Sequence, residues 1–217
     1  MSFILNSKDY MGYVKRAADH IGRSGDYISS LDAATGDGDH WLNINKGFHA
    51  LVEKSDHLES LGMSACLKEI GMMFMSVVGG SSGVLYGGAY VSASKYLAGG
   101  AEMNSEQLCG VLNTMAEDMI KRGKSEPGFK TMIDSIYPAA KAYSAGLESG
   151  LSDEEILENV KQAAMDGAEA TKEMPAIRGR ASYQTNKGVG HLDPGAVTMS
   201  YQIEDLCDYI LENKVGH

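Results

Sequence analysis

The sequence predicts an all-α protein on three observations. Residues with high helix propensity (alanine, leucine, methionine, glutamate and lysine) are plentiful, whereas proline occurs only 4 times and runs of β-branched residues are nearly absent. Apolar residues recur at helical spacing, as Leu67, Ile70 and Phe74 do. Helix start signals stand ahead of such periodic stretches. Together these observations favour a bundle of amphipathic helices.

The start signals locate two helices directly. Ser152 and Glu155 form a capping box before an apolar-periodic stretch, and Asp193 places a capping side chain before Pro194 at the first helical position. The second signal predicts a last helix from about residue 195 to about residue 212, which would be the ninth. The other eight expected helices lie near residues 8–22, 25–31, 40–55, 63–78, 82–98, 105–122, 131–146 and 153–172.

Composition predicts one globular domain, residues 1–217. The 217 residues are 43% hydrophobic and 22% charged, which suffices for a sizeable core, and no internal repeat or linker divides them. The formal net charge of -10 disfavours binding to nucleic acid or to anionic lipid. We therefore expect neither nucleic acid nor membrane as a partner.

The N-terminus and the cysteines predict a cytoplasmic location. Residues 1–6 lack a basic region followed by an apolar run, and no stretch approaches the roughly 18 apolar residues that span a bilayer. Cys66, Cys109 and Cys207 are an odd number without a Cys-x-x-Cys pair, which argues against a disulfide framework and against a thiolate zinc site. A reducing cytosol fits this pattern best.

Glycine is the exception to the helical composition, because glycine in a helix interior costs about 1 kcal/mol relative to alanine. Many of the 26 glycines fall in expected loops that also carry acidic, hydroxyl or arginine side chains. Close approach of backbone to a ligand requires such loops. They are residues 35–40, 78–83, 122–124 and 178–195.

Asp32, Asp37 and Asp39 form a candidate metal site. They fall directly before an expected helix, and carboxylates so close repel one another unless a cation lies between them. Oxygen ligands without cysteine favour Mg²⁺ or Ca²⁺, and Phe48 at the twelfth position from Asp37 excludes an EF-hand. The alternative is a solvated acidic turn in which Asp39 is an ordinary helix N-cap.

Two further loops are candidate anion sites. Residues 79–83 precede an expected helix, so their amides and hydroxyls could receive phosphate oxygens, although they match no P-loop and would also suit a flexible turn. Residues 178–195 are long for a loop, and Arg180 offers a guanidinium fork for phosphate. His191 could be a base, but an isolated loop histidine is more often structural or exposed.

These motifs, taken in order along the chain, carry a family resemblance. They are Gly36-Asp37-Gly38-Asp39-His40, Gly79-Gly80-Ser81-Ser82-Gly83, Arg122-Gly123-Lys124, Lys130-Thr131-Met132, Gly179-Arg180-Ala181-Ser182-Tyr183, Gly190-His191 and Asp193-Pro194-Gly195. In this order and spacing the chain resembles the DhaL family, the nucleotide-binding subunit of dihydroxyacetone kinase, over nearly its whole length.

The resemblance implies an antiparallel barrel of about eight amphipathic helices with a nucleotide site at one end. It implies ADP or ATP as cofactor with two Mg²⁺ ions held by Asp32, Asp37 and Asp39. No catalytic side chain is implied beyond the metal and phosphate ligands. The implied nucleotide-binding residues are His40, Trp41, Leu42, Asn43, Ser81, Ser82, Gly123, Met132, Arg180, Asp193, Pro194 and Gly195.

The resemblance also implies partners. In the form of the family that depends on the phosphotransferase system, ADP stays bound, a donor subunit (DhaM-like) rephosphorylates it, and the phosphate passes to dihydroxyacetone held by a substrate-binding subunit (DhaK-like). The length of 217 residues leaves no room for the additional substrate domain of single-chain kinases, which favours this form. A transcription regulator is a further partner that the resemblance allows.

Three departures from the family pattern leave alternatives open. Trp41 stands where glycine is usual, Phe129 replaces a usually acidic residue, and residues 184–187 replace the usual Leu-Gly-Glu-Arg. The alternatives are a related kinase subunit that acts on another ketose or polyol derivative and a non-catalytic ADP-binding regulatory module. An acidic helical scaffold without any ligand would leave the clustered aspartates, the glycine loops and Arg180 to coincidence.

Overall fold

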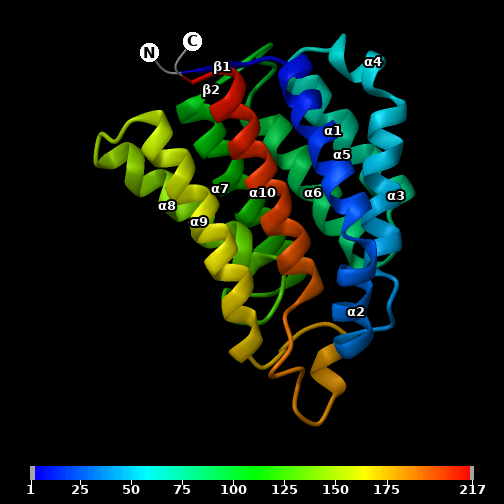
Figure 1. Ribbon diagram of the computed structural model, residues 1–217. Coiled ribbons are helices and arrows are strands. Elements are labelled where there is room, and N and C mark those ends of the chain that lie inside the picture. Colours follow the sequence, from blue (N-terminus) through cyan, green and yellow to red (C-terminus); the bar gives the residue numbers. More distant parts are fainter. Residues whose placement is uncertain (1–2, 216–217) are drawn as a thin grey trace.

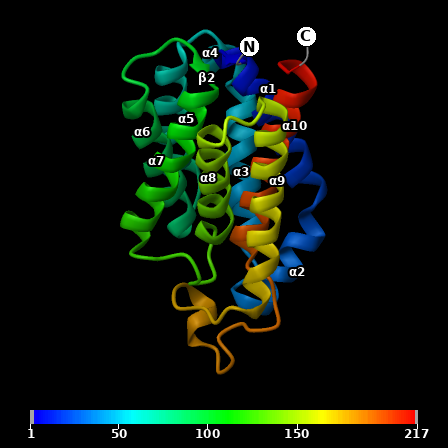
Figure 2. The same cartoon turned by 90° about the vertical axis from the view of Figure 1, so that its left-hand side faces the viewer.

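The computed structural model describes residues 3–215 and confirms the all-α class (Figure 1). Long helices lie side by side with similar axis directions, and the connections between them lie at both ends of the bundle (Figure 2). The ten α-helices within residues 3–215 are α1 Ser7–Arg23, α2 Gly25–Thr35, α3 His40–Glu53, α4 Ser55–Glu59, α5 Met63–Val77, α6 Gly80–Tyr96, α7 Ser105–Gly123, α8 Ile133–Glu148, α9 Asp153–Ala170 and α10 Pro194–Asn213.

Nine of these helices correspond to the nine expected ones. The prediction did not include α4, because its five residues are too few to show a helical period. It also ended α2 near residue 31, four residues short of Thr35. The capping box of Ser152 with Glu155 is confirmed at the start of α9, and Asp193 accepts a hydrogen bond from the amide of Ala196 at the start of α10.

Short elements complete the fold. Strands β1 (Ile4–Leu5) and β2 (Met103–Asn104) pair antiparallel, and η1 (Thr171–Glu173) and η2 (Arg180–Tyr183) are 3₁₀ turns in the connection from α9 to α10. The strand pair lies at the same end of the bundle as the start of α1 and the end of α10 (Figure 1). The connection from α9 to α10 lies at the opposite end, drawn in orange.

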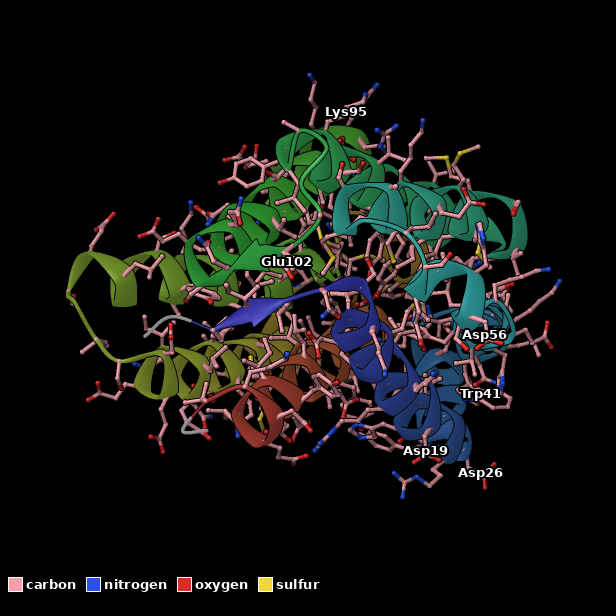
Figure 3. The ribbon with its side chains drawn as sticks, turned by 90° about the horizontal axis from the view of Figure 1, so that it is seen from above. Asp19, Asp26, Trp41, Asp56, Lys95 and Glu102 are labelled. Carbon is pink, nitrogen blue, oxygen red and sulfur yellow. The ribbon has the colours of Figure 1, made fainter. Side chains whose placement is uncertain are left out.

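Neighbouring helices pack in a closed order. Helix α1 packs on α3, α3 on α5, α5 on α6, and the order continues through α7, α8 and α9 to α10, which packs back on α1. Seen from above, side chains fill the space between these helices (Figure 3). The barrel that the family resemblance implies stays a prediction that this order supports.

The core combines aliphatic side chains with buried tyrosines whose hydroxyl groups have partners. The hydroxyl of Tyr86 accepts from the side-chain amide of Gln202 at 2.8 Å, and the hydroxyls of Tyr10 and Tyr90 lie 3.3 Å apart. Such pairing matters because a buried polar group without a partner costs about 1–3 kcal/mol. The three cysteines are buried and free of disulfide bonds. Within residues 3–215, none of the helices has both the length and the apolar character needed to cross a membrane.

Candidate functional site

A cavity of about 650 Å³ opens at the end of the bundle where α9 connects to α10. Its wall combines the α2–α3 loop, the first turns of α3, α6 and α10, the end of α7, the loop before α8 and residues 178–181. Four stretches that are far apart in sequence and rich in glycine therefore meet around one space. The structure thus brings together the loops that the sequence identified separately.

The acidic side of the cavity is the α2–α3 loop. One carboxylate oxygen each from Asp32, Asp37 and Asp39 can be chosen so that all lie within 4.8 Å of one another. The carboxylate of Asp32 is buried and accepts the amide N–H of His40 at 2.9 Å, so this side chain also joins the end of α2 to the start of α3. A Cβ at Gly36 would lie 2.2 Å from an oxygen of Asp32, which explains why glycine occupies that position.

This geometry decides against Asp39 as an ordinary helix cap. Asp39 is the N-cap residue of α3, but its side chain makes no capping hydrogen bond, and Asp32 from the preceding helix accepts the His40 amide instead. The carboxylate of Asp37 lies 2.5 Å from the guanidinium of Arg180. Three clustered carboxylates with oxygen donors only are a donor set that fits Mg²⁺.

The start of α6 forms a second side of the cavity. Gly79 and Gly80 lead into the helix and Ser81 and Ser82 occupy its first turn, where backbone amides have no partner within the helix. Gly80 has a φ of +66°, a conformation that glycine adopts at little cost. The amides and hydroxyls of this turn offer donors to an anion, and the helix dipole adds to their attraction.

Four cationic side chains line the cavity. The sequence singled out only Arg180 as a phosphate-binding cation, although Arg122 and Lys130 belong to the family motifs. Arg122 lies at the end of α7, where its guanidinium binds both carboxylate oxygens of Asp118. Arg178 donates from Nε to the carbonyl of Lys124 at 2.9 Å. Lys130 is buried among backbone carbonyls. These residues come from separate parts of the sequence, and the fold brings them together with Arg180 around one cavity.

Asp193 begins α10 and faces the same cavity. Its carboxylate accepts the amide of Ala196 at 2.7 Å, and its own amide donates to the hydroxyl of Thr171 at 2.9 Å. Removal from solvent raises the pKa of Asp193 to about 7, against the opposing effects of the Ala196 amide and of Lys130. This carboxyl group therefore changes protonation state near neutral pH.

The raised pKa predicts that Asp193 destabilises the folded protein as pH increases. The folded chain holds the proton up to about pH 7 whereas the unfolded chain releases it near pH 4, so stability falls between these values. We expect Asp193→Asn, which retains an acceptor for the Ala196 amide, to lack this loss. Urea unfolding without nucleotide or metal, from pH 5 to pH 8, should show the variant gaining stability relative to the wild type as pH rises. Parallel pH dependences of the two proteins would contradict the assignment.

The implied nucleotide-binding residues divide into two groups. Ten of them line the cavity, as do the three aspartates, whereas Trp41 and Leu42 do not. Trp41 donates from its indole nitrogen to the carbonyl of Ile21 at 3.0 Å, packs beside Gly25 and lies at the periphery of the bundle (Figure 3). Leu42 is 60% exposed. The ten residues in the wall are His40, Asn43, Ser81, Ser82, Gly123, Met132, Arg180, Asp193, Pro194 and Gly195.

An all-α chain that gathers clustered carboxylates, an open helix start and several cations around one cavity has the features of a metal-dependent domain for phosphorylated ligands. Residues 34–208 match the family described as "DAK2 domain". This chain belongs to that family. It is 34% identical over 202 residues to the ADP-binding subunit DhaL of the PEP-dependent dihydroxyacetone kinase of Escherichia coli, covering 93% of this chain and 96% of that one.

Other relatives agree with this assignment. The chain is 38% identical over 169 residues to an ADP-binding subunit DhaL from Listeria innocua, covering 78% of this chain and 79% of that one. The solved dihydroxyacetone kinase from C. freundii in complex with AMP-PNP and Mg²⁺ superposes with a TM-score of 0.71 at 26% identity. That comparison covers 91% of this chain and 33% of the kinase chain.

Proposed function

We propose that this chain is the nucleotide-binding subunit of a multi-subunit dihydroxyacetone kinase. In this role it holds ADP or ATP with two Mg²⁺ ions and passes phosphate from a donor subunit of the phosphotransferase system to dihydroxyacetone on a partner subunit. The observation that carries the proposal is the convergence of the three aspartates, the start of α6 and Arg180 on one cavity. The similarity to DhaL subunits over 93% of the chain supports it.

In this proposal Asp32, Asp37 and Asp39 hold the metal ions. Bound Mg²⁺ would neutralise charge on the phosphate oxygens during transfer. Asp32 is fixed by the His40 amide, so its carboxylate is oriented in advance of binding. Such preorganisation matters because phosphoryl transfer is catalysed mainly by positioning and charge stabilisation. No nucleophile is required from this chain.

The remaining cavity wall suits a nucleotide. Ser81 and Ser82 offer amides and hydroxyls to phosphate oxygens, and Arg180 adds a charged fork. Gly123 and Met132 also line the cavity. We place the adenine ring beside them, because methionine sulfur packs well against aromatic faces. His40, Asn43 and the turn of residues 193–195 complete the wall around the ligand.

The partners and the location follow from the same proposal. The E. coli relative, of which the chain covers 96%, is named an ADP-binding subunit, so we assign the acceptor site to a separate DhaK-like subunit and the donor to a DhaM-like subunit. A transcription regulator is a further partner that the proposal allows. We place the assembly in the cytoplasm, in line with the free cysteines.

A related acceptor is the second candidate. The chain is 26% identical over 175 residues to a protein named L-erythrulose kinase, of which it covers 30%. In the proposed scheme the acceptor binds to another polypeptide, so a different partner subunit would direct the same nucleotide site to another ketose. A regulatory module that binds ADP without transferring phosphate would require no acceptor.

The released ligands test the proposal most directly. The protein is purified without added nucleotide and denatured, and the supernatant is analysed by chromatography and by metal analysis. We expect ADP in near-equimolar amount together with Mg²⁺. A protein that releases no nucleotide and also fails to bind added Mg-ADP would overturn the proposal. Phosphate transfer to dihydroxyacetone or to erythrulose, measured with the partner subunits, then separates the kinase candidates from the regulatory module.

The position of Trp41 predicts that this residue is dispensable for nucleotide binding. In Trp41→Phe we expect the dissociation constant of Mg-ADP to stay within about twofold, since the indole lies outside the cavity. The free energy of unfolding should fall by about 1–2 kcal/mol, because the bond to the Ile21 carbonyl and part of the packing are lost. Calorimetry and urea unfolding measure the two quantities. A tenfold loss of affinity would instead place the indole at the nucleotide.

A further inference from the structure

Lys130 is a buried lysine that joins distant parts of the chain beside the cavity. It lies between α7 and α8, is 2% exposed, and has a φ of +60°, a left-handed conformation that residues other than glycine adopt rarely. Its ammonium group donates to the backbone carbonyls of Thr171 and His191. These two acceptors flank residues 172–190, so one side chain holds both ends of that segment.

The 172–190 segment is folded back on itself. The amide of Ala176 donates to the carbonyl of Lys187 at 2.8 Å, and the amide of Gly190 donates to the carbonyl of Lys172 at 2.8 Å. Gly188 packs on the lysine: a Cβ at this glycine would lie 3.1 Å from Cε of Lys130. Lys130 therefore fills the base of the folded segment in addition to bonding its ends.

This segment carries cationic residues of the cavity. Arg178, Arg180 and Ala181 line the cavity from it. His191, at its end, lies two residues before Asp193, the N-cap residue of α10. Two other contacts tie the segment to the loop that contains Lys130: the amide of Ile177 donates to Phe129, and Arg178 donates to Lys124. Both end at the α7–α8 connection. The segment is tied on its other side by Gln184, which donates to the carbonyl of Ala34 at 2.9 Å, and by the pair of Arg180 with Asp37. The α7–α8 connection therefore helps to position the arginines.

Three carboxylates lie near enough to the ammonium group to affect it electrostatically. Burial lowers the pKa of Lys130, whereas the nearby carboxylates of Asp193, Asp134 and Glu173 act to raise it. Asp134 in turn accepts the amides of Gly128 and Thr131 and so shapes the loop on which Lys130 stands. An apolar side chain at position 130 would remove the ammonium donor from both carbonyls, leaving that of Thr171 with the Met174 amide alone. It would also remove positive charge from beside Asp193.

We propose that Lys130 is a positioning residue of the nucleotide site: by joining Thr171 to His191 it holds the 172–190 segment, and with it Arg180, against the cavity. The proposal rests on the proposed function, because its effect on binding presupposes that the cavity takes Mg-ADP. Lys130 acts through the segment and needs no contact with the ligand. The charge-assisted bonds of its ammonium group carry this role.

Three variants test this role. Lys130→Met removes the donors while retaining most of the volume, Lys130→Arg retains charge and donors, and Lys172→Met removes an exposed lysine from the same segment. We measure the dissociation constant of Mg-ADP by calorimetry, and in ligand-free protein the rate of tryptic cleavage after Arg178, Arg180 and Lys187. Circular dichroism and a urea transition report whether each variant is folded.

For Lys130→Met we expect at least about tenfold weaker binding and about tenfold faster cleavage within the segment, with a cooperative transition retained. Lys130→Arg should restore both values to within about threefold of the wild type, and Lys172→Met should match the wild type. A folded Lys130→Met protein with unchanged affinity and unchanged cleavage would overturn the proposal. If that variant does not fold, Lys130→Gln takes its place, and failure of both to fold would also overturn it, since the lysine would then serve the whole fold.

The two proposals can fail separately. A wild-type protein that binds no Mg-ADP would reject the proposed function, and the cleavage rates in ligand-free protein would still decide whether Lys130 holds the segment. A wild-type protein that binds Mg-ADP, together with a Lys130→Met variant that matches it in both measurements, would reject the role of Lys130 alone.

Discussion

Replacing Asp37 by alanine is expected to abolish Mg²⁺-dependent binding of ADP. Asp37 supplies one of three carboxylates whose oxygens lie within 4.8 Å of one another, and its removal leaves an incomplete ligand set for the cation. It also removes the partner of the Arg180 guanidinium. Loss of a residue that only hydrogen-bonds to a metal ligand already costs about 10–100-fold in metal affinity, so loss of a direct ligand should cost at least about 100-fold.

Calorimetric titration of ADP with and without Mg²⁺ measures this loss. Asp26→Ala is the matched control, since Asp26 is an exposed aspartate in the first turn of α2, the helix that carries Asp32. The control should bind as the wild type does, and the urea transition of Asp37→Ala should remain cooperative. Unchanged affinity in Asp37→Ala would remove the aspartates from the proposed metal site.

Gly83→Ala is expected to lower the free energy of unfolding by about 2–3 kcal/mol, the range of overpacked interiors. A Cβ at this position would lie 2.1 Å from the carbonyl oxygen of Val78 and 3.1 Å from that of Phe74, both of which are backbone atoms. Relief of the overlap requires the first turn of α6 to move away from the end of α5. Because Ser81 and Ser82 stand on that turn, we expect Mg-ADP affinity to fall in parallel.

Urea unfolding and calorimetry on the same preparation measure both effects. Gly22→Ala provides the control, since Gly22 lies in the last turn of α1 and a Cβ there meets its nearest atom at 3.7 Å. Alanine should be neutral at that position or stabilise by up to about 1 kcal/mol, as helix propensity predicts. If Gly83→Ala is as stable as the wild type, the prediction is wrong. The first turn of α6 would then be able to shift away from the Val78 carbonyl without loss of stability.

Residues whose role depends on neighbours in sequence could be predicted, whereas those that act through distant contacts could not. The aspartates and the glycines of the α2–α3 loop fall within a few positions of one another, so their proximity is visible in the sequence. Lys130 meets its acceptors 41 and 61 positions further along the chain. No local pattern records such a contact, because the packing of α8, α9 and α10 creates it.

Helix geometry explains the division at the start of α3. Successive residues of a helix are rotated by about 100°, so residues three positions apart share a face and adjacent residues do not. His40 and Asn43 therefore line the cavity together, while Trp41 and Leu42 face elsewhere. A short motif read as a unit cannot distinguish these faces. The expected helix from about residue 40 contained the information needed to separate them, whereas the family motif grouped them together.

The cavity and the paired short strands lie at opposite ends of the bundle (Figure 1). Helix α1 starts and α10 finishes at the strand end, so an attachment made beyond either helix leaves the cavity mouth clear. An affinity tag or a surface tether should therefore not obstruct a ligand or a docking subunit. The same arrangement is compatible with covalent fusion to another domain. In the C. freundii kinase the matching region is 33% of a longer polypeptide.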